Sequence, residues 1–471
     1  MFVFSFIHGK NFSTSWMKIA LRKLTREANF LSLSGNLVIA FLGFAGFALL
    51  ARTFPVDIFG QWVLFIAAGS FVEMFRFGIT NTAIIRYLSG VENEERLKFV
   101  GSNGLIGLVA TCFIATVIWS CHLLFPDPIQ RAGYELFFTW YPLLAFINLP
   151  FNTALVIMQA DLNFGRMLMI KSLNSGGFFL VVLINYLFFK MTLIELVLLL
   201  LVINLLTSIV CIINGWDGFR HIRKANRQTN RVLLDFGKYT TFTLIGTNLL
   251  RSADTLIISL SPMGTAAVAL YSIPMKLTEI QQIPLRSFVA TAFPKMSKAS
   301  IQGKIEEVRS VFYTYSGAMT YLFFFISLAT FIFADLFVLI LGGRQYMGID
   351  PLTGVNTANI VRIFSLYGLI LPIDRMTGIG LDSINRPDKN FIKVLIMVVA
   401  NIVGDLIAIF IFKSLPLVAV ASILFTSIGV WVGYRFLHKE LQLNEKLVFT
   451  AGIDFYKEMY SKLRQNLHLR K

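Results

Sequence analysis

The sequence predicts an all-α integral membrane protein with about twelve transmembrane helices, and three observations support this fold class. Of its 471 residues, 56% are hydrophobic and only 14% are charged, against roughly 45–50% and about 25% in ordinary soluble domains. The hydrophobic residues gather in runs close to the about 20 residues that cross a bilayer, and Lys and Arg are concentrated in alternate connections between these runs. This composition excludes a soluble enzyme.

The apolar runs follow one another along the whole chain, separated by charged or turn-rich segments. One or two such runs could be buried helices of a soluble protein, but twelve in one chain indicate a helical bundle that spans a membrane. The predicted spans are 34–51, 60–79, 101–124, 136–158, 172–189, 191–213, 239–260, 266–293, 312–333, 357–381, 394–412 and 416–434.

The net charge of +16 is distributed unevenly between the two sides of the predicted bundle. The N-terminal segment, the C-terminal tail and every second connection carry 31 Lys and Arg, whereas the other side carries 5. Because positively charged loops stay in the cytoplasm, both termini are expected there. A basic segment after the sixth span divides the chain into two six-helix lobes. The expected parts are 1–33 (N-terminal segment), 34–213 (N-lobe), 214–238 (linker), 239–434 (C-lobe) and 435–471 (tail).

Six cations lie within predicted spans, where each central charge costs about 2.5–3.5 kcal/mol, so the bundle interior must be polar or contain ion pairs. We expect Arg76 and Arg362, which lie near span ends, to pair locally or to reach a lipid headgroup. The remaining four are Arg251, Lys276, Arg286 and Arg375, and the carboxylates in the spans are Glu73, Asp254, Glu279, Asp374 and Asp405.

Two spans of the second half carry a polar stripe along one helix face, within an arc of about 80°. Such faces are typical of helices that line a cavity, and Pro274 and Pro284 are expected to bend the second helix. Alternatively, Arg251 with Asp254 and Lys276 with Glu279 are simple i,i+3 ion pairs. The stripe of span 239–260 is Thr240, Thr243, Thr247, Arg251 and Asp254, and that of span 266–293 is Lys276, Glu279 and Arg286.

The excess of cations in these stripes favours an anionic substrate, because Arg presents a planar fork to phosphate oxygens and Lys a point charge. An exporter of organic cations would instead need unpaired carboxylates, and Asp254 and Glu279 each have a cation three residues away. No Walker, HExxH, CxxC or Gly-x-Ser-x-Gly motif occurs, and the three cysteines lie in or beside apolar runs. We therefore expect no cofactor or metal, apart from a coupling ion, H⁺ or Na⁺.

Several segments together resemble the polysaccharide (O-antigen, Wzx-type) flippases of the multidrug/oligosaccharidyl-lipid/polysaccharide (MOP, MATE-like) superfamily. The resemblance covers nearly the whole chain, and its patterns are diffuse: they are specific for the superfamily and weakly specific for the substrate. They are Ser34-Gly35-Asn36, Phe59-Gly60-Gln61-Trp62, residues 271–297 (YSIPMKLTEIQQIPLRSFVATAFPKMS), Leu341-Gly342-Gly343 with Tyr346, and residues 378–387 (GIGLDSINRP).

This resemblance implies two six-helix lobes around a central cavity and transport of an undecaprenyl-diphosphate-linked oligosaccharide, such as an O-antigen, capsule or exopolysaccharide unit, by alternating access. The implied partners are that lipid-linked glycan, the membrane lipids, a polysaccharide polymerase and the chain-length machinery. Carried over by position, the substrate-binding candidates are Arg251, Lys276, Arg286, Thr247 and Asn36, and the ion-coupling candidates are Asp254, Glu279, Glu73 and Asp374.

Three alternatives stay open at the level of sequence. A peptidoglycan-precursor (lipid II-type) flippase shares the repeat architecture, and an ion-coupled multidrug exporter belongs to the same superfamily. From another class, a membrane-embedded glycosyltransferase, ligase or polymerase would need positioned acid-base groups, yet the longest outer loop is only 334–356 and no Asp-x-Asp motif occurs. The C-terminal tail is expected either to lie on the inner leaflet or to form a solvated helix or a disordered end.

Overall fold

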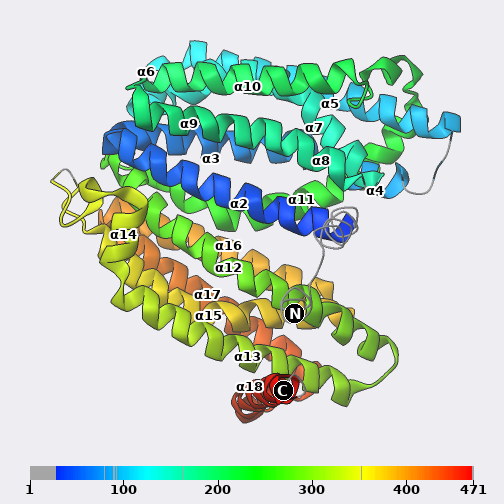
Figure 1. The fold of residues 1–471 in the computed structure, drawn as a ribbon, viewed down its shortest axis with the longest axis vertical. Coiled ribbons are helices and arrows are strands. Elements are labelled where there is room, and N and C mark those ends of the chain that lie inside the picture. Colours follow the sequence, from blue (N-terminus) through cyan, green and yellow to red (C-terminus); the bar gives the residue numbers. More distant parts are fainter. Residues whose placement is uncertain are drawn as a thin grey trace, which may run out of the picture. The chain divides into compact units, whose positions relative to one another are not determined.

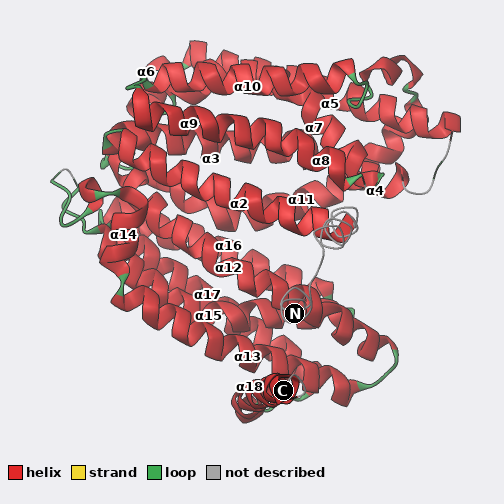
Figure 2. Ribbon diagram, viewed as in Figure 1, coloured by secondary structure: helices red, strands yellow, loops and turns green. Residues whose placement is uncertain are grey.

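The computed structural model describes residues 28–468 except Ile79, Ser89, Gly90, Glu92, Leu162 and Leu352. Within this part of the chain, α-helices account for nearly all regular structure, and the residues Ile349 and Asn356 form a single isolated β-bridge (Figure 2). The helices of the first half are α2 (Ala28–Thr53), α3 (Val56–Gly78), α4 (Asn81–Leu88), α5 (Asn93–Leu124), α6 (Pro126–Arg131), α7 (Glu135–Ala160), α8 (Phe164–Lys171), α9 (Gly177–Phe188) and α10 (Leu193–Ile213).

The second half contains longer helices. Short π-helical turns, Ser172–Gly176 and Ile407–Ile411, connect α8 to α9 and extend α16, and 3-10 turns cover Phe219–Lys224 and Arg344–Tyr346. The helices are α11 (Arg227–Ser259), α12 (Gly264–Ile301), α13 (Ile305–Ile332), α14 (Ala334–Gly342), α15 (Thr357–Ser383), α16 (Pro387–Leu406), α17 (Leu415–Leu441) and α18 (Glu445–His468).

Each of the twelve predicted spans lies along one of these helices, or along α9 or α16 together with an adjoining π-helical turn, to within two residues at either end, which confirms the predicted fold class. Among the described residues, nine helical segments are long and apolar enough to cross a membrane, and the apolar part of α2, Val38–Thr53, is a shorter tenth. Helices α11 and α12 have 33 and 38 residues and are long enough to span a membrane. They are not among the nine apolar segments, because they carry the polar stripes seen in the sequence. Helix α11 begins at Arg227, inside the segment predicted as a linker.

Side-chain caps and prolines define several helix starts. Thr192 and Glu195 form a capping box at the start of α10, which satisfies two backbone N–H groups that no helical carbonyl can reach. The Asn163 side chain accepts from the Arg166 N–H at the start of α8, and Pro387 occupies the first position of α16, where a missing N–H costs nothing.

The chain forms two compact units, and the first comprises Met1–Gly46, Arg76–Ala115 and Leu143–Lys238. Its most deeply buried charge is Arg76, whose side chain is fully enclosed. The guanidinium donates to the Thr111 hydroxyl at 3.1 Å, to Asn148 Oδ1 at 3.1 Å and to the Ala145 carbonyl at 2.6 Å. Arg76 therefore pairs locally with groups of α5 and α7, which is one of the two possibilities expected from the sequence. The other possibility, an extended side chain that reaches a lipid headgroup, does not occur.

The second unit comprises Phe47–Phe75, Thr116–Pro142 and Tyr239–Lys471. Helix α15 packs against α12, α13 and α17, and α16 packs against α17; Figure 1 shows these five helices running alongside one another. An apolar core joins α12, α13, α15 and α17 and includes Leu285, Phe312, Phe323, Leu371 and Leu437. This arrangement surrounds the cavity described below.

Helix α18 packs across α13 (Figure 1). The two helices touch backbone to backbone: a Cβ atom added to Gly317 would lie 2.0 Å from the Val448 carbonyl oxygen, and one added to Gly452 would lie 2.5 Å from the Gly317 carbonyl carbon. The Tyr456 hydroxyl also donates to the Ala318 carbonyl at 2.8 Å. Close approach through small residues is the usual way in which membrane helices associate, so α18 is part of the packed unit.

Candidate functional site

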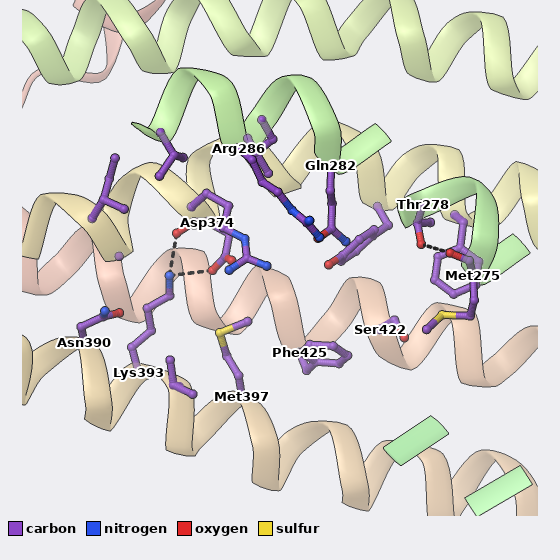
Figure 3. Close-up of a pocket in the computed structure, with 18 of the residues that line it drawn as sticks. Met275, Thr278, Gln282, Arg286, Asp374, Asn390, Lys393, Met397, Ser422 and Phe425 are labelled. Atoms are coloured by element: carbon purple, nitrogen blue, oxygen red, sulfur yellow. Dashed lines mark hydrogen bonds and ion pairs between the residues drawn. The ribbon is translucent and has the colours of Figure 1, made fainter. Parts of the chain in front are cut away.

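An elongated cavity of about 510 Å³ lies within the second unit, among α11, α12, α15, α16 and α17 (Figure 3). Its volume is in the range of small-molecule sites, and its walls mix charged, polar and aromatic side chains. The lining includes Asp254, Met275, Thr278, Gln282, Arg286, Phe364, Tyr367, Asp374, Arg375, Asp382, Asn390, Lys393, Met397, Ser422 and Phe425.

Two guanidinium groups, Arg286 of α12 and Arg375 of α15, are exposed within this lining. Neither forms an ion pair with any residue that the structure describes. Buried or membrane-embedded cations without a counter-charge are costly, so both side chains are suited to an anionic group that enters the cavity. The sequence placed both in spans, and Arg286 was among the substrate-binding candidates.

A third cation, Lys393 of α16, is already neutralised. Its Nζ lies 2.6 Å from Asp374 Oδ1 and donates to the Asp374 carbonyl at 2.7 Å and to the Thr377 hydroxyl at 3.2 Å, as Figure 3 shows for the first two contacts. Lys393 is only 3% exposed. Nearby, the Asn390 amide donates to both carboxylate oxygens of Asp382, at 3.0 and 2.9 Å. Of the two carboxylates near Lys393, Asp374 is therefore paired with the lysine and Asp382 is held by the Asn390 amide.

A cluster of buried polar groups lies at the opposite end of the cavity, around Asp254. The Tyr271 hydroxyl donates to Asp254 Oδ2 at 2.7 Å, and Ser422 Oγ lies 3.3 Å from the same oxygen. The Asn401 amide nitrogen lies 3.2 Å from Asp254 Oδ1 and 3.1 Å from Asp405 Oδ2. One amide group thus bridges two carboxylates from α11 and α16, and all five side chains are buried.

Two acceptors in this cluster, Asn401 Oδ1 and Asp405 Oδ1, have no hydrogen-bond partner among the described residues. Two carboxylates this close in a low-dielectric interior repel each other strongly unless a proton or a cation lies between them. The cluster can therefore take up a proton or bind a monovalent cation. In the described part of the chain, no three His, Cys, Asp or Glu side chains gather as a metal site.

Lys276 and Glu279 lie outside the cavity lining and form an i,i+3 ion pair on α12, with Nζ 2.8 Å from Glu279 Oε2. The same Nζ lies 5.6 Å from the ring centroid of Phe47, a cation–π distance. The simple pairing considered from the sequence is therefore present for these two residues. Their predicted roles in substrate binding and ion coupling stay predictions.

The other candidates are scattered. Glu73 on α3 accepts a hydrogen bond from the Tyr141 hydroxyl at 2.9 Å, and Arg362 on α15 forms an ion pair with Asp335. Asn36, Thr247 and Arg251 lie on α2 and α11, but their side chains are outside the described residues, so their predicted roles are not addressed by the structure.

Sequence reasoning missed Lys393, which was assigned to the loop 382–393, because α16 begins at Pro387 and carries this lysine into the interior. It also did not single out Asn401, although Asn401 and Asp405 are four residues apart in an otherwise apolar run and so share a helix face. That spacing was a usable signal. No sequence signal marked the partners Tyr271 and Ser422, because both are ordinary residues in apolar helices.

The comparisons with known proteins agree with this architecture. The family model described as "Polysaccharide biosynthesis protein" matches residues 49–351. Among solved structures, the chain is similar to an inward-facing multidrug resistance MATE family transporter of the MOP superfamily, with a TM-score of 0.72 and 13% identity over 88% of this chain and 98% of that one. It is also similar to the lipid II flippase MurJ in an inward closed conformation, with a TM-score of 0.67 and 14% identity over 92% of both chains.

A search of curated proteins finds no match to this chain. At 13–14% identity, the structural matches establish a shared fold and nothing about the substrate. The family match, however, covers well over half of the chain. The protein therefore belongs to the polysaccharide biosynthesis protein family, and it is a multi-pass membrane protein with the fold of the MOP superfamily.

Proposed function

We propose that this protein is a flippase that moves an undecaprenyl-diphosphate-linked oligosaccharide across the bacterial inner membrane, with both chain termini in the cytoplasm. The observation that carries the proposal is the pair Arg286 and Arg375, two guanidinium groups that line a membrane-embedded cavity without a counter-ion among the described residues. The family match to polysaccharide biosynthesis proteins supports the glycan part of the substrate.

A diphosphate fits this pair chemically. Each guanidinium can donate two parallel hydrogen bonds to phosphate oxygens, and charge-assisted bonds of this type are about twice as strong as neutral ones. Inside the membrane, the diphosphate would neutralise two costly cations at once. The polyprenyl tail would stay in the lipid, so that only the polar headgroup needs to enter the cavity.

Movement would follow by alternating access, in which rigid groups of helices rock around a fixed site. Substrate binding can shift such an equilibrium only by its differential affinity for the two states. No covalent step is required, and the chain's own residues bind, neutralise and release the headgroup. A polymerase and chain-length proteins are proposed partners that would consume the product.

We place the coupling ion, H⁺ or Na⁺, at the cluster of Asp254 and Asp405 rather than at Asp374. Asp374 already has a counter-charge in Lys393, whereas the Asp254 cluster contains two carboxylates and two acceptor atoms to which no described residue donates. Because Asp254 also lines the cavity, the charge state of the cluster would affect the site in which the substrate binds.

The alternatives are weaker on the same geometry. A multidrug exporter for organic cations would need a cavity with surplus carboxylate, yet the three cations of the lining match its three carboxylates in number. A lipid II-type flippase would also bind a diphosphate, so the two flippase classes differ in the glycan and are separated by experiment. A glycosyltransferase or polymerase would need positioned acid-base groups, and the Asn401 amide already engages the carboxylates of Asp254 and Asp405.

The decisive experiment is an analysis of lipid-linked oligosaccharides in a deletion strain. We expect one undecaprenyl-diphosphate-linked intermediate to accumulate, and we expect it to disappear when the wild-type gene is restored. The double variant Arg286→Gln/Arg375→Gln should fail to restore export at normal protein levels. Arg131→Gln removes an exposed guanidinium far along the chain, in α6, and serves as the matched control. Accumulation of a peptidoglycan precursor instead would assign the lipid II-type alternative.

A further inference from the structure

The two ends of the cavity in the second unit differ chemically. On α15, Phe364 and Arg375 are eleven residues apart, which separates them by about 16 Å along the helix axis. Helices α12, α15 and α17 run in the same direction and α16 runs against them, so each lining residue can be assigned to an end. Near the α15–α16 turn lie Arg286, Arg375, Asp374, Asp382, Asn390 and Lys393, and near the α11–α12 turn lie Asp254, Met275, Thr278, Phe364, Tyr367, Ser422 and Phe425.

The end near the α15–α16 turn, here called the basic end, contains Arg286 and Arg375, the two lining guanidinium groups that have no ion-pair partner among the described residues. The lysine at this end is held by Asp374, and Asp382 is the remaining carboxylate. Figure 3 shows Asp374, Lys393 and Asn390 together on one side of the cavity, away from Met275, Thr278 and Ser422, and the Arg286 side chain extending toward the middle of the cavity beside Gln282. Phosphate oxygens are therefore best neutralised at the basic end.

The opposite end, here called the aromatic end, is unsuited to phosphate and suited to sugar. Of the aromatic side chains here, Tyr367 is half-buried, whereas Phe364 and Phe425 are only 4% and 6% exposed and offer little of their ring faces. The rings of Phe364 and Tyr367 meet edge to face with centroids 6.1 Å apart. A hexose ring presents a face of C–H groups that packs on an aromatic ring, while its hydroxyls need a few positioned polar groups. Thr278 and Ser422 line the cavity here, and the Asp254 carboxylate would repel a phosphate.

We propose that the substrate binds with its first sugar at the aromatic end and its diphosphate at the basic end, so that the glycan enters the cavity ahead of the lipid. This inference rests on the proposed function and adds an orientation and a sugar subsite at Tyr367, with Phe364 and Phe425 in the wall beside it. It also places the sugar, rather than the diphosphate, beside Asp254. By linkage, the affinity of the Asp254 cluster for its ion would then depend on the sugar.

The test compares two probes with the full-length protein in detergent micelles: undecaprenyl diphosphate without sugar, and undecaprenyl diphosphate carrying one N-acetylglucosamine. Binding of each probe is measured by native mass spectrometry. Phe425→Leu and Tyr367→Leu keep the sites apolar but remove the rings, and Phe331→Leu, at an exposed aromatic of α13, is the matched control.

We expect Phe425→Leu and Tyr367→Leu to weaken binding of the sugar-bearing probe about three- to tenfold and to leave the sugar-free probe within about twofold. Arg375→Gln should weaken both probes by at least about tenfold, because it removes charge-assisted hydrogen bonds to the shared diphosphate. If the ring variants weaken both probes equally or neither, while Arg375→Gln acts as expected, the orientation is wrong and the proposed function stands. If the wild-type protein binds neither probe, the proposed function itself fails.

A second measurement needs no variant and so does not depend on how a mutant folds. The ion affinity of the wild-type protein is measured by titration with H⁺ and Na⁺ in the presence of each probe. We expect the sugar-bearing probe to shift this affinity and the sugar-free probe to leave it unchanged. An equal shift with both probes, or a shift with neither, contradicts the orientation.

Discussion

The ion pair between Lys393 and Asp374 offers a quantitative test of how the cavity wall is held together. Lys393 is 3% exposed and its side chain makes three contacts, to the Asp374 carboxylate, the Asp374 carbonyl and the Thr377 hydroxyl. Breaking such a pair by removing one partner leaves an uncompensated buried charge, which costs about 3–5 kcal/mol. We therefore expect Lys393→Met and Asp374→Asn each to lower the free energy of unfolding by about this amount.

The double variant Lys393→Met/Asp374→Asn should behave differently, because replacing a buried pair by uncharged groups of similar volume is often nearly neutral. We expect it to recover most of the loss, which gives a coupling energy of several kcal/mol in a double-mutant cycle. Unfolding is followed by circular dichroism in mixed micelles of dodecyl maltoside and sodium dodecyl sulfate. Additive losses in the double variant would refute the pairing as the source of stability.

Three further changes have defined outcomes. Gly317→Val should detach α18 from α13 and make α18 accessible to protease, because the added Cβ atom would lie 2.0 Å from a carbonyl oxygen of α18. The control variant Gly165→Val should leave α18 protected, because a Cβ atom at Gly165 would have no neighbour within 4 Å. Arg76→Met should lower the free energy of unfolding by at least about 3 kcal/mol, measured in the same mixed micelles, since several buried acceptors lose their donor; an effect below about 1 kcal/mol would contradict the network. Asp254→Asn should abolish the ion dependence of transport in proteoliposomes while binding of sugar-free undecaprenyl diphosphate persists, and unchanged ion dependence would exclude the Asp254 cluster.

The helices could be predicted from the sequence because each apolar run is long enough to cross a bilayer by itself. Helix spacing also gave the pairing of Lys276 with Glu279, three residues apart on one face. Contacts across helices could not be predicted in this way: Asp254 meets Asn401, 147 residues later in the chain, and nothing local to either residue specifies that contact.

The position of Lys393 and the packing of α18 could not be predicted from the sequence either. Lys393 reads as a loop residue until the start of α16 is fixed at Pro387, after which one and a half turns of helix carry it into the interior. For the C-terminal tail, the sequence left open a place on the inner leaflet, a solvated helix or a disordered end, and it did not predict that α18 packs against α13 through Gly317 and Gly452. A glycine-to-glycine contact has no signature in hydrophobic periodicity.

The central claim, that cavity guanidinium groups carry a diphosphate-linked glycan through the membrane, is tested most directly by flipping in proteoliposomes. Undecaprenyl-diphosphate-N-acetylglucosamine is incorporated in both leaflets, and the outward-facing sugar is capped by a galactosyltransferase that cannot cross the bilayer. With wild-type protein and with Arg131→Gln, nearly all of the lipid should become capped as it flips. With Arg286→Gln/Arg375→Gln, capping should stop near the half that starts outside, and complete capping at the wild-type rate would contradict the claim.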